Sequence, residues 1–445
     1  MFTNAITSNR ITLDREDAPG TVTLSLTETG EIISSVTGEV PAPESAMDSL
    51  AQHAGNMAPQ SHDLHGKTPN GIPVTITEAV TESDYTDSPN GQLTRIRPAT
   101  VTFDSTPGAP FVEESVTITF DMLNFRAPKT FHPQPDDTPL LTRDDLLFHS
   151  SRLPDIDDRL DKIREYRQPL RTATITVTQS VNGPADVQLD HASRSLEPIA
   201  WLFAFVQGVF PAPIRARITA VDGECVPWTY ERWLTTWRDD IGHAFTGARI
   251  DWANDVRVFL DDAYNRFTDR ADQYRYRRCI SWYLDALLDR MVEGRVASIA
   301  AGIEVLAERH AAYTDEPIGG DREPRNTDPD EDAGECDKSD DTKGKTAARI
   351  QHLVQELGVD VDDLVAFSES FEENPAAVNE YFYATTRNFV LHNARDTHPF
   401  DAVFTDYEAA LTLFRRLLFE ELTGGVEHDR YTSLSDLSPT DQRFE

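Results

Sequence analysis

The chain has 445 residues, which is long enough for two or three domains and a sizeable core. Its 41 basic and 76 acidic side chains leave a formal net charge of -35, and only six of the basic residues are lysines. In dilute buffer such a charge argues against a polyanionic partner such as nucleic acid.

The acidic residues occur throughout the chain while lysine is nearly absent, and this composition resembles that of proteins adapted to molar salt. At about 1 M salt the screening length falls to roughly 3 Å, so global repulsion largely vanishes. We therefore interpret the composition as a halophilic acidic surface, and it does not exclude an RNA substrate.

The sequence carries no sign of a membrane or a secreted protein. It begins Met1-Phe-Thr-Asn-Ala-Ile, without the basic segment and apolar run of a signal peptide. The longest apolar run, 199–210, is shorter than the roughly 20 residues of a membrane span. Cys225, Cys279 and Cys336 are few and far apart, which indicates a reducing compartment and offers no metal-ligand spacing. We expect a cytoplasmic protein without a membrane partner.

The first half of the chain is predicted to form antiparallel strands. Apolar residues alternate with Thr or Ser at a period of two in five segments. These segments are Thr21–Leu26, Pro73–Thr77, Ala99–Phe103, Val116–Phe120 and Thr172–Thr178. We further predict a long loop over 41–71, a helix over 196–208 that packs on the sheet, and a strand beginning at Ile214.

From about Tyr230 the pattern changes to helices. Apolar residues spaced by three or four predict one long amphipathic helix over 280–310. Residues 314–346 contain twelve Asp or Glu, three Pro and almost no apolar residue, so a disordered acidic insertion is expected there.

Three further helices are predicted from their end signals. One is stopped by Gly358, and the next begins at Asn374-Pro375 and runs to about His392. The last spans 406–422, opened by a capping box over 405–408 and closed by Gly424-Gly425.

Together these patterns predict an α+β protein with a β-rich domain followed by an all-helical domain. The predicted divisions are a β-rich N-terminal domain with one or two packed helices over 1–229, a helical connector over 230–279, a helical domain over 280–425 that contains the insertion, and a disordered tail over 426–445.

One constellation could carry chemistry: Arg387-Asn-Phe-Val-Leu-His392, near the end of a predicted helix. It resembles the Arg-x(4–6)-His signature of the HEPN superfamily, small helical domains of which many are metal-independent ribonucleases of toxin–antitoxin and antiviral systems. The resemblance implies a helical bundle, an RNA substrate, no metal or other cofactor, and a homodimer that pairs two motifs. The layout is similar to ApeA-type antiphage proteins, which implies a phage-derived or protein trigger at the N-terminal domain.

The residue types suit RNA cleavage by the 2′-hydroxyl. His392 would act as general acid and base, and Arg387 would hold the charge that gathers on the phosphate oxygens. Residues five apart lie about 140° apart around a regular helix, so the two can converge only where the helix ends or unwinds. Asn388 lies one turn before His392 and could orient its imidazole.

Other interpretations stay open. With 35 Arg and 12 His, about three such spacings are expected by chance, and three others occur: Arg126 with His132, Arg143 with His149, and Arg238 with His243. The motif could instead be a buried helix-end histidine with a surface ion pair. The alternative function is a noncatalytic HEPN-like module for dimerisation or ligand sensing.

Overall fold

The computed structural model describes residues 5–13, 21–37, 62–84, 93–105, 116–127, 139–143, 145–166, 169–180, 183–220, 230–234, 253–288, 291–314, 349–361, 364 and 400–425. They form a large antiparallel sheet and a set of helices, so the predicted α+β class is confirmed. The chain divides into two compact units. Unit 1 comprises residues 1–128, 132–197 and 211–243, and unit 2 comprises 129–131, 198–210 and 244–445.

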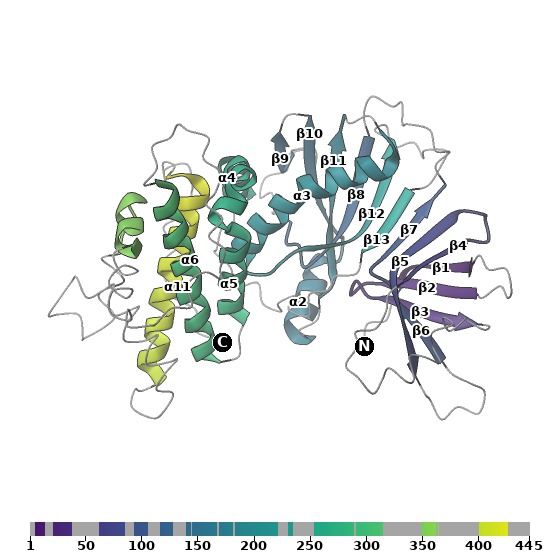
Figure 1. Cartoon of the computed structure of the whole chain (residues 1–445), viewed down its shortest axis with the longest axis horizontal. Coiled ribbons are helices and arrows are strands. Elements are labelled where there is room, and N and C mark those ends of the chain that lie inside the picture. Colours follow the sequence, from purple (N-terminus) through teal and green to yellow (C-terminus); the bar gives the residue numbers. More distant parts are fainter. Residues whose placement is uncertain are drawn as a thin grey trace, which may run out of the picture. The chain divides into compact units, whose positions relative to one another are not determined.

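Unit 1 contains a 13-stranded sheet whose paired strands are all antiparallel (Figure 1). The strands are β1 (Ala5–Leu13), β2 (Thr21–Thr27), β3 (Ile32–Thr37), β4 (His62–Lys67), β5 (Pro73–Asp84), β6 (Leu93–Arg97), β7 (Thr100–Asp104), β8 (Val116–Leu123), β9 (Leu141–Arg143), β10 (Leu146–Arg152), β11 (Arg171–Gln179), β12 (Ala212–Ala220) and β13 (Tyr230–Leu234). Their order is β3-β2-β1-β4-β5-β7-β13-β12-β8-β11-β10-β9, with β6 paired to β5.

The five segments with a period-two pattern all lie in strands, as predicted. Along β7 and the first part of β2 every second side chain is buried, because one face of a strand meets the core and the other does not. The short helix α2 (Ile156–Tyr166) precedes β11, and the long helix α3 (Ala185–Gln207) follows it. Gln179 at the end of β11 donates a hydrogen bond to the carbonyl of Gln188 in the N-terminal part of α3. The helix predicted over 196–208 is therefore the second half of a longer helix, and from residue 198 it belongs to unit 2, where Phe205 packs against Phe259 and Tyr283.

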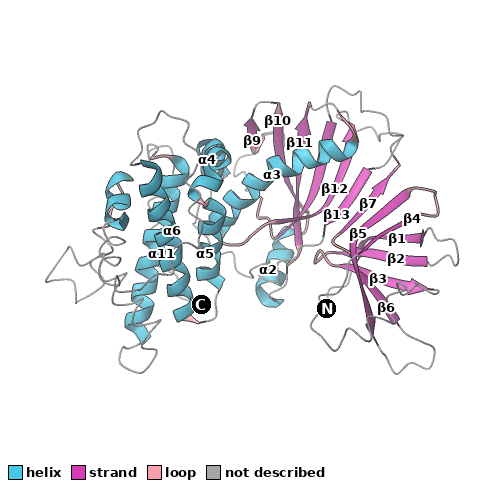
Figure 2. Ribbon diagram, in the orientation of Figure 1, coloured by secondary structure: helices cyan, strands magenta, loops and turns pink. Residues whose placement is uncertain are grey.

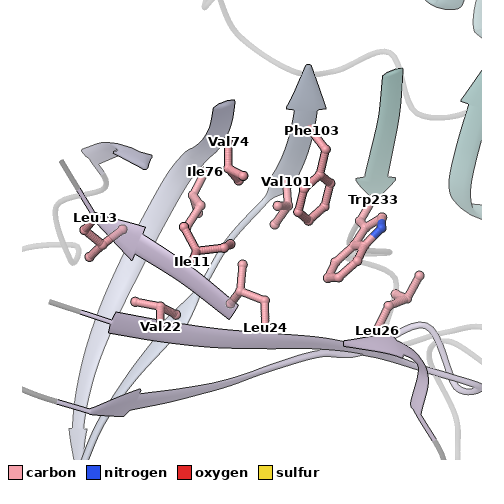
Figure 3. Packing of buried hydrophobic residues seen from close by; sticks show 10 residues of the cluster. All are labelled: Ile11, Leu13, Val22, Leu24, Leu26, Val74, Ile76, Val101, Phe103 and Trp233. Atoms are coloured by element: carbon pink, nitrogen blue, oxygen red, sulfur yellow. The ribbon is translucent and has the colours of Figure 1, made fainter. Parts of the chain in front are cut away.

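The sheet curls so that distant strands share one core. Figure 3 shows Leu24 and Leu26 of β2 facing Phe103 of β7 and Trp233 of β13, although β13 lies five places from β2 in the strand order. The rings of Phe103 and Trp233 lie 4.9 Å apart between their centroids. The turn after β2 accordingly reaches β11, where the amide of Arg171 donates to the carbonyl of Glu28 at 2.8 Å.

Unit 2 is helical in its described residues (Figure 2). Its helices are α4 (Ala253–Tyr274), α5 (Tyr276–Leu288), α6 (Val292–Thr314), a short helix over 349–356, α11 (Phe400–Thr423) and the C-terminal part of α3. Aromatic side chains fill the centre: the rings of Phe259 and Phe419 stack 5.8 Å apart, and Tyr283 contacts both Phe205 and Phe414. Gly358 and Gly424 follow their helices with positive φ, which confirms both predicted helix ends.

Two strands lie where other structure was predicted. Residues 62–67, placed in a long loop, form β4 between β1 and β5. Gly66 allows this pairing: a Cβ there would meet the carbonyl oxygen of Thr12 at 2.5 Å, so glycine lets the backbones of β4 and β1 approach. Residues 230–234, placed at the start of a helical connector, form β13 because both neighbours, β7 and β12, offer free edges to it.

Besides α3, two helix predictions were wrong in extent. The single helix over 280–310 is two helices, α5 and α6, and Met291 between them is 63% exposed, outside the apolar stripe to which it was assigned. The closing helix begins at Phe400, so Thr405 lies inside α11 and forms no capping box. An N-cap preference is worth only about 1 kcal/mol, and the longer helix brings Phe404 against the ring of Tyr407.

The compact units differ from the predicted domain boundaries. Residues 230–234 belong to unit 1, whereas α4, placed in a connector, packs against α11 as part of the helical unit. The predicted acidic insertion, the helix from 374 to 392 and the tail beyond 425 lie outside the described residues. No helix among the described residues is both long and apolar enough to span a bilayer.

Candidate functional site

The predicted catalytic residues Arg387, Asn388 and His392 lie outside the described residues. Their geometry therefore stays a prediction. The structure does describe the helix that follows them in sequence, α11.

The competing Arg–His spacings fare differently. Arg143 and His149 lie on the adjacent strands β9 and β10, so this pair is no helical motif. Arg126 follows β8, and its histidine lies outside the described part of the chain, as do Arg238 and His243.

Within unit 2 the described residues form a buried polar cluster around Glu421, which we call the Glu421 cluster: Glu421, Arg266, Tyr276 and His310. Each comes from a different helix, α11, α4, α5 and α6 in that order. The Glu421 side chain is fully buried and accepts hydrogen bonds from the Tyr276 hydroxyl at 2.9 Å and the Arg266 guanidinium at 3.1 Å. Its second oxygen lies 3.0 Å from Nδ1 of His310.

The cluster perturbs the titration of its members. Burial alone would raise the pKa of Glu421, but the hydrogen bond from His310, the charge of Arg266 and the hydrogen bond from Tyr276 outweigh it, so its pKa is lowered. Burial, followed by the charge of Glu421, raises the pKa of Tyr276 well above its ordinary value. Glu421 is thus held as a carboxylate and Tyr276 as a neutral hydroxyl donor.

The other side of His310 faces the short helix over 349–356. Because Nδ1 donates to Glu421, Nε2 is directed to the Glu356 carboxylate, 3.7 Å away. Glu356 also lies 4.0 Å from Nε2 of His352, and the ring of Tyr274 meets His310 edge-on. A carboxylate-oriented imidazole is an arrangement used by general bases.

His310 is enclosed by its neighbours, and this limits the chemistry that its imidazole can do. Only 5% of His310 is exposed, so a substrate atom could not reach its imidazole in this conformation. The cluster therefore joins four helices of unit 2, with Glu356 of the short helix beside His310, and it stabilises the bundle. Sequence reasoning did not single it out, but a signal existed: His310 and Glu421 are polar residues next to the apolar stripes of Ile303–Leu306 and of Leu418–Leu422.

Unit 1 has a comparable network of alternating charges across its sheet. Arg171 binds the Glu28 carboxylate through two nitrogens and reaches Asp121 at 3.2 Å. Asp121, only 2% exposed, also pairs with Arg215 at 2.8 Å, and Arg159 of α2 binds Glu28 at 2.8 Å. These pairs attach the turn after β2 to the middle of the sheet, so the network too is structural.

Among the described residues no group of three or more His, Cys, Asp or Glu could hold a metal ion. Comparison of the chain with protein-family models, with curated proteins and with solved structures finds no match in any of the three.

Proposed function

We propose that the chain is a metal-independent endoribonuclease of the HEPN type that acts in antiviral or toxin-like defence. The observation that carries this proposal is the sequence from Arg387 to His392, which precedes the closing helix α11 of a helical unit. The proposal extends to a cytoplasmic homodimer whose HEPN-like bundle follows a β-rich N-terminal part, with a phage-derived or protein trigger acting on that part.

In the proposed reaction His392 removes the proton of a ribose 2′-hydroxyl, and the 2′-oxygen attacks the adjacent phosphorus. The bond from phosphorus to the 5′-oxygen breaks, and the protonated imidazole returns a proton to the leaving oxygen. The products are a 2′,3′-cyclic phosphate and a 5′-hydroxyl. Arg387 stabilises the nonbridging oxygens as their charge rises, and Asn388 orients the imidazole.

The experiment compares RNA cleavage by the wild-type full chain with that by Arg387→Ala and His392→Ala, in buffer of about 2 M KCl that suits the acidic surface. Arg10→Ala and His65→Ala are matched controls, because both side chains are exposed on strands of unit 1. Loss of general acid–base catalysis lowers a rate by about 100-fold or more, so cleavage should fall by that factor in the first pair only.

The chemistry gives a second readout. Cleavage should persist in EDTA and leave 2′,3′-cyclic phosphate ends. Cleavage that continues unchanged in both Arg387→Ala and His392→Ala would overturn the assignment of the site. A wild-type homodimer that binds RNA without cutting it would overturn the enzymatic proposal in favour of a noncatalytic module.

A further inference from the structure

The corner between α4 and α5 is basic, in contrast to the rest of the chain. Residues 266–278 contain five arginines and two aspartates within thirteen positions, whereas the whole chain has a net charge of -35. Two tyrosines, Tyr274 and Tyr276, are interleaved with these arginines. A local excess of arginine among aromatic residues is the composition of surfaces that bind single-stranded nucleic acid.

The backbone of the corner leaves Arg275 and Arg278 exposed. Arg275 has φ of 54° between the two helices, and its carbonyl accepts the amides of Arg278 and Cys279, which starts α5. Cys279 therefore points into the core, while Arg275 and Arg278 are exposed. Neither guanidinium forms an ion pair within the described part of the chain.

Two of the acidic groups near the corner are paired with arginines of the corner. Asp272 pairs with Arg277 at 2.8 Å, and Glu421 is buried against Arg266. Asp269 is the exposed acid that remains on this part of α4. Within residues 266–278, which the structure describes in full, the exposed charge is thus positive.

An aromatic stack lies beside the arginines. The ring of Tyr274 stacks on that of Tyr276 at 5.5 Å and contacts that of Tyr313, also at 5.5 Å, on α6. Arg270 lies over the Tyr274 ring at 5.9 Å. Since Tyr276 is held by Glu421, the stack is fixed at its inner end, and Tyr313 at its outer end is 37% exposed.

We infer that Arg270, Arg275, Arg278 and Tyr313, which we call the corner surface, bind single-stranded RNA. The arginines contact successive phosphates, and Tyr313 stacks on a base. The inference rests on the proposed ribonuclease function and adds where the substrate strand is held. Because stacking and phosphate contacts are the same for every base, this surface confers affinity without sequence preference.

The test measures binding of a fluorescently labelled single-stranded RNA by anisotropy in the full chain carrying His392→Ala, which prevents cleavage. In that background Arg275→Gln/Arg278→Gln is compared with Arg10→Gln/Arg194→Gln, a control that removes the same charge from exposed positions of unit 1. KCl is varied between about 0.3 and about 2 M, and circular dichroism at each salt verifies that every variant is folded.

Each lost phosphate contact lowers the slope of log affinity against log salt by about 0.7 for single strands. The corner pair should therefore lower the slope by about 1.4, and the control pair should leave it near the wild-type value. Tyr313→Ala should weaken binding by roughly 5- to 160-fold, the range for one stacked base, whereas Tyr313→Phe should bind as the parent does.

The outcomes separate this inference from the proposed function. A slope that is equal in the corner pair and the control pair, or an absence of RNA binding at every salt, would overturn the corner surface. If the wild type cleaves RNA through His392 while the corner pair binds normally, only the corner surface fails. If the corner pair weakens binding but wild type never cleaves, the corner surface stands and the ribonuclease proposal fails.

Discussion

Replacement of Glu421 by glutamine tests whether the Glu421 cluster stabilises unit 2. The carboxylate accepts three hydrogen bonds, from Tyr276, Arg266 and His310, while an amide offers one oxygen and turns an NH₂ group toward at least one of these donors. A hydrogen bond to a charged group is worth about 1.5–3 kcal/mol, and breaking a buried ion pair costs about 3–5 kcal/mol. We expect Glu421→Gln to lower the free energy of unfolding by about 3 kcal/mol.

The assay is urea unfolding in about 2 M KCl, with hydrogen exchange of peptides from α4, α5, α6 and α11 to assign the change to unit 2. A loss of about 3 kcal/mol corresponds to a fall in Tm of roughly 6–12 °C for a unit of this size. Glu408→Gln is the matched control on the same helix: burial raises the pKa of Glu408, so removing its charge should be neutral or slightly stabilising. Equal stabilities of the two variants, within about 0.5 kcal/mol, would refute the reasoning.

The lowered pKa of Glu421 also predicts how the stability of the protein depends on pH. The pKa of Glu421 is lowered in the folded protein from the ordinary value of 4.5, so the unfolded chain binds the proton first as the pH falls. Its stabilising contribution is therefore complete above that ordinary pKa and is lost as the pH falls through the lower folded value. The stability difference between wild type and Glu421→Gln should shrink across that window, and a constant difference down to the acid limit would contradict the assignment.

Three further predictions concern other buried groups. Asp121→Asn should lower the free energy of unfolding by about 3–5 kcal/mol, because two arginines lose their buried partner; a change under about 1 kcal/mol in urea unfolding would refute this. Gly302→Ala should lower the free energy of unfolding by about 1–3 kcal/mol in the same assay, since its Cβ would lie 2.3 Å from the Phe414 ring; an unchanged unfolding midpoint would contradict this. Burial raises the pKa of Cys279 to about 12, so with the other two cysteines replaced by serine this thiol should react with a disulfide reagent at about pH 8 only after unfolding.

Much of the sheet could be predicted from local pattern, because half-buried strands alternate polar and apolar residues wherever they lie in the fold. The pattern in β2, β7, β8 and β11 is therefore visible in the sequence. Residues of β4 show no such pattern, since only Leu64 among them is a large apolar residue. They form a strand because β1 and β5 supply hydrogen-bonding partners on both sides, which is a non-local cause.

The functional candidates also include one group that is visible in the local sequence and one that is not. Arg387 and His392 stand out as a motif because they are close in sequence, and their function remains a prediction to be tested by mutation. His310 and Glu421 each stand out only as a polar residue beside an apolar stripe. Which residues they meet could not be predicted, since the members of the Glu421 cluster are separated by up to 155 positions and meet only when the helices pack.

By itself the sequence determined the α+β class, the principal strands and the glycine-stopped ends of two helices. These properties depend on residues within a few positions of one another or on composition alone. Only the tertiary structure decided that the sheet curls β2 onto β13, that the long apolar stripe breaks into α5 and α6, and that arginines and an exposed tyrosine share the α4–α5 corner. The meeting of β2 with β13 and of Tyr313 with Tyr274 depends on contacts between residues far apart in the chain, and no local pattern encodes which distant partner will be met.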